Sequence, residues 1–205
     1  MFVVLFGVAI GLNSDVPGAG STDAKIRAYF NDHGNQLKLE IGYFICTLAV
    51  LCLLWFVGFL ASQVRAAAQD QPWLARIVVG SGTASSLLML AGFAANSMVA
   101  ATAEHTSRFH VDPDTTRVIT DLSYPLTFET ALPLAAPLVL ATTLALRRGE
   151  LIGIWFGRAG FAVAILCVVG FLGVPMGFYL VWLLSVAVVL ARRQVRPPHE
   201  APSYT

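Results

Sequence analysis

Long apolar runs separated by short polar stretches dominate the pattern of this chain. A helix needs roughly twenty apolar residues to cross the hydrocarbon core of a bilayer. The pattern therefore predicts an all-α fold, a polytopic transmembrane helical bundle of about six spans. The approximate spans are 1–12, 39–62, 77–103, 122–146, 151–171 and 174–191. We expect residues 1–195 to form a single domain and residues 196–205 to be a disordered cytoplasmic tail.

The first run, MFVVLFGVAIGL, is short for a span. A helix of this length reaches only about 18 Å, against about 30 Å of hydrocarbon. We expect it to be the outer part of a first transmembrane helix that is completed by tilt or by local thinning of the bilayer.

Two longer polar stretches, 13–38 and 104–122, interrupt the apolar pattern. In the first, Ser21-Thr22-Asp23 is typical of a helix N-cap, and Ile26, Tyr29 and Phe30 follow at helical spacing. This pattern predicts a short amphipathic helix. The second stretch is expected to be a solvated loop.

The third span is rich in small residues, among them Gly80, Gly82, Gly92 and Ala95. Small side chains let helix backbones approach closely in lipid, where there is no hydrophobic force between helices. We therefore expect this helix to be central in the bundle.

The fourth span contains Pro125, Pro133 and Pro137. Proline has no N–H, so each proline leaves the carbonyl four residues earlier without its helical partner. For Pro133 that carbonyl belongs to Glu129. The sequence therefore predicts a kinked fourth helix, with the kink close to a carboxylate.

Composition narrows the class of protein. The chain is 57% hydrophobic, has a mean hydropathy of +0.72 and is only 12% charged, about half the charged share of a soluble domain. A net charge of +1 leaves no electrostatic footprint for nucleic acid. The lipid bilayer is the partner that this composition predicts.

Orientation follows from the arginines. Seven basic residues lie in 65–76, 147–150 and 192–196, which share one side in a six-span topology. The opposite side has more acidic than basic residues. By the positive-inside rule the arginine-rich side is cytoplasmic, so we expect a plasma-membrane protein with a cytoplasmic C-terminus.

Ionisable side chains within spans are costly and therefore mark candidate sites. Glu129 is the leading catalytic candidate, and Asp121 precedes it on the same helical face, with Pro125 between them. Glu40 is the third candidate.

Polar residues on neighbouring spans supply candidate binding residues. Tyr43 and Thr47 follow Glu40 along one face, while Asn96 lies at a similar depth on the third span and Tyr124 begins the fourth. Thr47, Asn96 and Glu129 would then line one outward-facing polar cavity. The alternative is a structural cluster of hydrogen bonds between helices.

No metal site or cofactor is predicted. Glu104 and His105, followed by His110, Asp112 and Asp114, can all ligate metals, but their spacing matches no standard zinc signature. Catalytic-serine, P-loop, dinucleotide and zinc-protease motifs are absent from the sequence.

Four segments together resemble a family of actinobacterial multi-pass membrane proteins that carry a domain of unknown function. They are Ile26-Arg27-Ala28-Tyr29-Phe30, Leu53-Leu54-Trp55-Phe56, Trp155-Phe156-Gly157-Arg158-Ala159-Gly160 and Val189-Leu190-Ala191-Arg192-Arg193. The resemblance implies topology and membership, and it implies no activity and no functional residues.

Three functional hypotheses fit these observations. The first is a non-enzymatic accessory or small-molecule-responsive component, whose partner is a small hydrophobic ligand or another membrane protein. The second is a membrane enzyme acting on a lipid or isoprenoid, by analogy with terpene cyclases that use carboxyl groups as general acids. The third is a small transporter.

Overall fold

The structure is a computed structural model that describes residues 1–18, 20–105, 110–169 and 175–194. These residues form eight α-helices and one π-helical segment, which confirms the all-α prediction. Four helical stretches are long and apolar enough to cross a membrane, namely His33–Ala67, Pro72–His105, Pro113–Arg148 and Pro175–Arg192. Two further apolar helices are shorter, so the expectation of about six spans agrees with the fold. The predicted tail, 196–205, lies outside the described residues.

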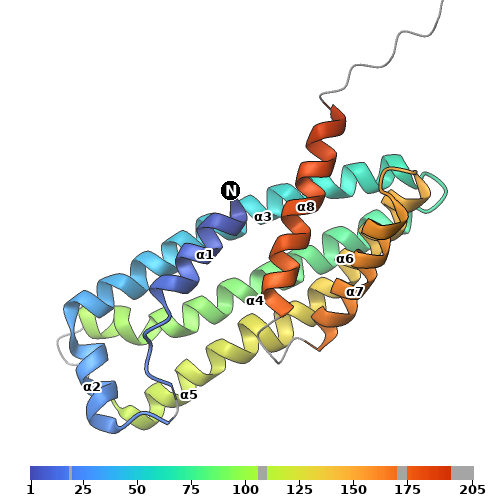
Figure 1. The fold of residues 1–205 in the computed structure, drawn as a ribbon. Helices are drawn as coiled ribbons and strands as arrows, with labels where there is room; N and C mark the ends of the chain where they lie inside the picture. Colours follow the sequence, from blue (N-terminus) through green and yellow to red (C-terminus); the bar gives the residue numbers. More distant parts are fainter. Residues whose placement is uncertain (19, 106–109, 170–174, 195–205) are drawn as a thin grey trace, which may run out of the picture.

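Three long antiparallel stretches form the body of the bundle (Figure 1). The elements in chain order are α1 (Phe2–Leu12), α2 (Asp23–Asn31), α3 (His33–Ala67), α4 (Pro72–His105), α5 (Pro113–Tyr124), η1 (Pro125–Thr130), α6 (Ala131–Arg148), α7 (Ile154–Val168) and α8 (Pro175–Gln194). Helix α4 lies between α3 on one side and the α5–η1–α6 stretch on the other. Helix α1 packs on α3, while α7 packs on α6 and on α8.

Several helices extend beyond the predicted spans. Helices α3 and α4 have 35 and 34 residues, which correspond to about 50 Å each at the rise of an α-helix. The hydrocarbon core accounts for only about 30 Å of that length. The expectation of a loop over 104–122 is wrong for residues 113–122, which are helical in α5. The polar ends are helical because neighbouring elements pack against them.

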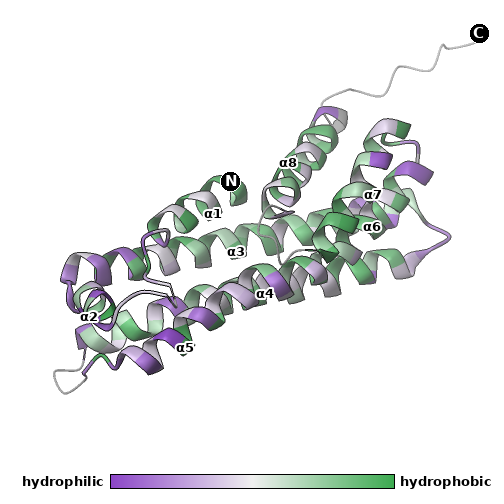
Figure 2. Cartoon of the chain, turned by 60° about the horizontal axis from the view of Figure 1, so that its bottom comes forward, coloured by the Kyte–Doolittle hydropathy of each residue, from purple (hydrophilic) through white to green (hydrophobic). Residues whose placement is uncertain are grey.

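The two ends of the bundle differ in character. At one end, here called the arginine end, the loops 68–71 and 149–153 lie together, and a side chain added at Gly149 would come within 3.0 Å of Ala67 Cβ. The other end, here called the cap end, carries α2 and α5. Figure 2 shows hydrophilic residues concentrated on α2 and α5, whereas the helices of the bundle are mainly apolar.

A small second core builds the cap end. It consists of Ile26, Phe30, Leu39, Val99, Ala100 and Val111, separate from the main core of the bundle. Ile26 and Phe30 come from α2, so the predicted amphipathic helix is confirmed together with its buried face. Thr22 caps this helix by accepting a hydrogen bond from the Lys25 N–H, as the sequence indicated. The cap end is therefore packed around its own apolar cluster.

The fourth span changes its helical form where the prolines predict irregularity. The segment Pro125–Thr130 is π-helical, and the Ala131 N–H donates to the Leu126 carbonyl, five residues back. A π-helical turn inserts one extra residue into the helix and redirects the side chains that follow. Helix α6 then continues through Pro137 to the arginine end.

Helix α4 approaches this π-helical segment most closely at Gly92. A Cβ at Gly92 would lie 2.8 Å from the Ser123 carbonyl oxygen and would overlap the Thr127 hydroxyl. A Cβ at Gly82 would lie 2.7 Å from both Leu138 Cδ1 and Val57 Cγ2. Gly82 therefore lies tightly between Val57 of α3 and Leu138 of α6. The central position predicted for this helix agrees with these contacts.

Gly80 provides a matched control for the role of Gly92, because nothing lies within 4 Å of a Cβ built there. In a helix, Gly→Ala ordinarily stabilises by up to about 1 kcal/mol. We expect Gly80→Ala to be neutral or stabilising in detergent. Gly92→Ala should destabilise by about 1–3 kcal/mol because the backbones must separate. Thermal unfolding of the two variants at equal membrane yield measures the difference, and equal melting temperatures would contradict the close contact.

Candidate functional site: a pocket beneath the cap helices

A pocket of about 600 Å³ lies where α1, α4, α5 and η1 meet. This volume is within the range of pockets that hold small molecules. Its lining comprises Ile10, Asn13, Ser14, Val16, Pro17, Gly18, Gly92, Phe93, Asn96, Thr120, Asp121, Ser123, Tyr124, Pro125, Thr127 and Phe128. Polar and apolar side chains are both well represented, as a binding site for an amphiphilic molecule requires.

Two asparagines join α1 to α4 at the wall of the pocket. The Asn96 amide donates to Asn13 Oδ1 at 3.4 Å, and the Asn13 amide donates to the Ala9 carbonyl at 3.0 Å. The Asn96 carbonyl oxygen Oδ1 is buried and accepts no hydrogen bond within the described part of the chain. A buried acceptor without a donor costs about 1–3 kcal/mol. This wall therefore favours a partner that supplies an N–H or an O–H.

The π-helical segment forms the opposite wall. Tyr124 and Phe128 lie one turn apart with ring centroids at 4.9 Å, and both line the pocket. Thr127 is buried against Gly92 on the same segment. A π-helical turn often marks a functional site because it reshapes the surface of a helix. Here it contributes an aromatic surface to the pocket.

The segment between α1 and α2 closes the pocket from the cap end, through Ser14, Val16, Pro17 and Gly18. Arg117 of α5 holds the far side of this segment. One guanidinium nitrogen donates to the Ser21 carbonyl at 2.9 Å and to Asp23 at 2.5 Å, and the other donates to Asp114 at 2.8 Å. The covering segment is therefore tied to α5, the helix that also supplies Asp121 and Tyr124.

Asp112 fixes the start of α5. Its carboxylate accepts from the Thr115 hydroxyl at 2.6 Å and from the Thr115 N–H at 3.0 Å. These hydrogen bonds to the ionised form lower the pKa of the Asp112 carboxyl. The Asp112 carboxylate thus caps α5, and the Asp114 carboxylate accepts a hydrogen bond from Arg117. Neither residue belongs to the group of metal-capable residues described below.

The structure brings together only part of the predicted set of site residues. Asn96, Asp121 and Tyr124 line one pocket. Glu129 is exposed on η1 and lies outside that lining. Thr47 donates to the Tyr43 carbonyl on its own helix at 2.9 Å. The expected cavity between Thr47, Asn96 and Glu129 is replaced by a pocket on the other side of Asn96.

The reason for this difference is rotation of the helix faces. The π-helical segment begins four residues after Asp121 and contains Glu129, so the two carboxylates do not keep the common face expected of a regular helix. The segment 14–18, which the sequence marked only as turn material, contributes four lining residues. Its turn-forming residues carried no signal of a pocket wall, because its position depends on contacts with elements far along the chain.

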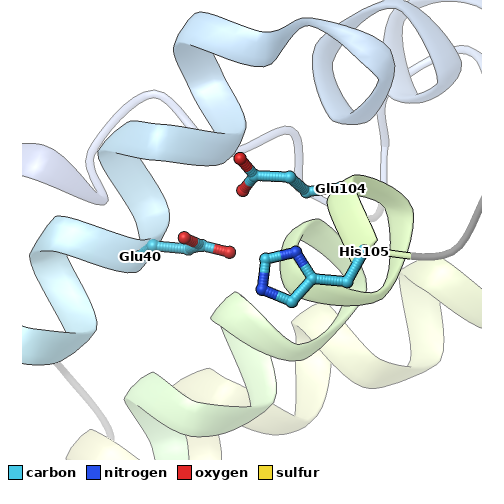
Figure 3. A group of neighbouring side chains, drawn as sticks. All are labelled: Glu40, Glu104 and His105. Atoms are coloured by element: carbon cyan, nitrogen blue, oxygen red, sulfur yellow. The ribbon is translucent and has the colours of Figure 1, made fainter.

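Glu40 belongs to a different group of side chains. It lies on α3 beside Glu104 and His105 at the end of α4, and one ligand atom from each residue lies within 4.8 Å of the others (Figure 3). The sequence indicated that Glu104 and His105 can ligate metals, but it grouped them with His110, Asp112 and Asp114. Glu40 reaches them because α3 and α4 are antiparallel.

Comparisons with protein-family models, with curated proteins and with solved structures find no match for this chain.

Replacement of Arg117 tests the closure of the pocket. The Arg117 side chain is 24% exposed. It joins Ser21 and Asp23, at the start of α2, to α5. We expect Arg117→Met to lower stability by only about 1 kcal/mol. Hydrogen exchange over residues 14–31 should nevertheless increase clearly, because the segment loses its anchor. Arg76→Met, at the arginine end, is the control and should leave that exchange unchanged. Equal protection in both variants would show that the segment is held by packing alone.

Proposed function

We propose that this chain is an integral protein of the cell membrane that binds a small amphiphilic molecule in the pocket beneath its cap helices. It acts as a non-enzymatic, ligand-responsive component. The observation that carries the proposal is the pocket itself, whose lining includes Asn96, Tyr124 and Phe128. The Asn96 Oδ1 is buried and accepts no hydrogen bond from the described residues. A preformed pocket that combines apolar surface with hydrogen-bonding groups is the usual form of a small-molecule site.

The lining suggests the chemistry of the ligand. Asn96 Oδ1 and the Asp121 carboxylate both accept hydrogen bonds, so the polar end of the ligand carries a hydroxyl or an amine. Ile10, Phe93 and Phe128 offer apolar area for the remainder. The volume of about 600 Å³ suits a molecule of drug-like size.

The position of the pocket favours entry from the membrane interface. Asn96 is 19 residues beyond Ile77, where the predicted third span begins (96 minus 77), or about 29 Å along α4. This is close to the roughly 30 Å thickness of the hydrocarbon core. We place the pocket near the outer boundary of that core, within reach of amphiphilic molecules in the bilayer.

The geometry supports binding better than acid catalysis. A carboxyl group that protonates a hydrocarbon substrate must be protonated and shielded from water. Asp121 and Glu129 are both exposed, and Glu40 lies with Glu104 and His105 away from the pocket lining. The carboxylates proposed for an isoprenoid enzyme thus do not meet around one substrate volume.

We assign the cap end to the outer side of the membrane and the arginine end, with the C-terminus, to the cytoplasm. The arginines near the loops 68–71 and 149–153 support this orientation through the positive-inside rule. The polar helices α2 and α5 then form the outer surface, and the pocket lies beneath them.

Reporter fusions test the orientation. Fusions after Arg148 and after Arg193 should behave as cytoplasmic, and an insertion within 108–115 should be external. The physical reason is the cost of translocating arginine-rich loops. An external signal from the fusion after Arg193 would reverse the assignment and place the pocket on the cytoplasmic side.

Native mass spectrometry of the detergent-purified chain tests the pocket. We expect the parent to retain a co-purifying small molecule of discrete mass. Asn96→Leu keeps the branched shape and the number of heavy atoms but removes the acceptor. It should reduce the occupied fraction at least tenfold, because the donor of the ligand would then be buried without a partner. Thr47→Val, outside the lining, is the control and should retain the molecule. Equal occupancy in both variants, or none in the parent, would contradict the proposed function.

A further inference from the structure

The antiparallel pair α3 and α4 brings two carboxylates and an imidazole together at the cap end. Glu40 comes from α3, and Glu104 and His105 come from the last turn of α4. Figure 3 shows the three side chains converging on one small volume. One ligand atom from each of them lies within 4.8 Å of the others. The group lies apart from the lining of the pocket described above.

The two carboxylates face each other without a donor between them. Glu40 Oε1 and Glu104 Oε2 are both buried and accept no hydrogen bond from the described residues. Like charges at this separation repel, and the repulsion grows as water is excluded. Lys38, close in sequence, is turned to Asp15 at 4.0 Å. The pair therefore requires a cation or a shared proton.

We propose that Glu40, Glu104 and His105 bind a divalent metal ion of the zinc type. Carboxylate oxygen and imidazole nitrogen bind Zn²⁺ at about 2.0–2.2 Å, so two ligand atoms of a tetrahedral ion lie about 3.4 Å apart. From the spacing within 4.8 Å, the ends of these side chains must close by about 1.4 Å at most, which rotation about their bonds provides. A mixed set of one imidazole and two carboxylates favours zinc or a similar transition ion over calcium or magnesium, which prefer oxygen alone.

Two features of the surroundings support the ion. The last carbonyls of α4 carry a partial negative charge, which favours a cation beside Glu104 and His105. The imidazole Nδ1 of His33 lies 3.7 Å from Glu104 Oε1. His33 begins α3. On this proposal its imidazole helps to orient the Glu104 carboxylate toward the ion without binding the ion itself. The bound ion would join the ends of α3 and α4 at the edge of the cap.

Equilibrium binding of Zn²⁺ to the detergent-purified full chain, with any affinity tag removed, tests the site. We expect one ion per chain in the parent. Glu40→Gln and Glu104→Gln should each weaken binding at least tenfold, because each removes an anionic ligand. Glu129→Gln and His110→Ala match these changes chemically and should bind as the parent does. Asn96→Leu should also bind zinc normally, so failure of the pocket and failure of the metal site are distinguishable.

Thermal stability gives a second, independent measurement. Without metal, Glu40→Gln should be at least as stable as the parent, because it relieves the repulsion with Glu104. Added Zn²⁺ should raise the melting temperature of the parent by mass action and leave that of Glu40→Gln nearly unchanged. The absence of zinc binding in the parent would show a carboxyl pair that shares a proton and would overturn the proposal. Binding that survives both glutamine substitutions would overturn it as well.

Discussion

The close contact between α4 and the π-helical segment at Gly92 is the constraint on which the pocket depends. In a bilayer the backbone must satisfy its own hydrogen bonds, and prolines in the fourth span prevent a regular helix from doing so. The π-helical turn at Pro125–Thr130 accommodates this irregularity. It also moves Ser123 and Thr127 against α4, where only a glycine leaves room. The pocket is the space that remains beside this contact.

The cap end adds a second level of organisation. Its small core holds α2 and α5 against the projecting ends of α3 and α4, separately from the main core of the bundle. Arg117 then ties the covering segment to α5 through Ser21 and Asp23. The pocket thus has a wall that belongs to the bundle and a cover that belongs to the cap. The cover is held by these hydrogen bonds and by packing, because Val16 lies against the small core.

The metal-capable group and the pocket share no residue, and they involve different chemistry. The pocket combines polar and apolar side chains, whereas the group at Glu40 brings two carboxylates and an imidazole together. On the metal proposal, an ion at Glu40 and Glu104 would stiffen the ends of the helices from which α2 and α5 are supported.

The hydrophobic pattern alone determined the all-α membrane fold, because only helices satisfy the backbone within lipid over such lengths. It also determined the amphipathic helix with Ile26 and Phe30 and the irregular fourth span, because both follow from local rules of capping and of proline. Residues 113–122 carry local helix signals that the loop expectation overlooked, an Asp112 N-cap followed by Pro113 at the start of α5. Tertiary structure decided that α5 packs against α2 and α4. It also decided that Asn96 shares a pocket with Asp121 and Tyr124 while Thr47 and Glu129 lie outside that lining. The group of Glu40, Glu104 and His105 likewise depends on tertiary structure. Their proximity arises from the register of two antiparallel helices, which no local spacing along the chain encodes.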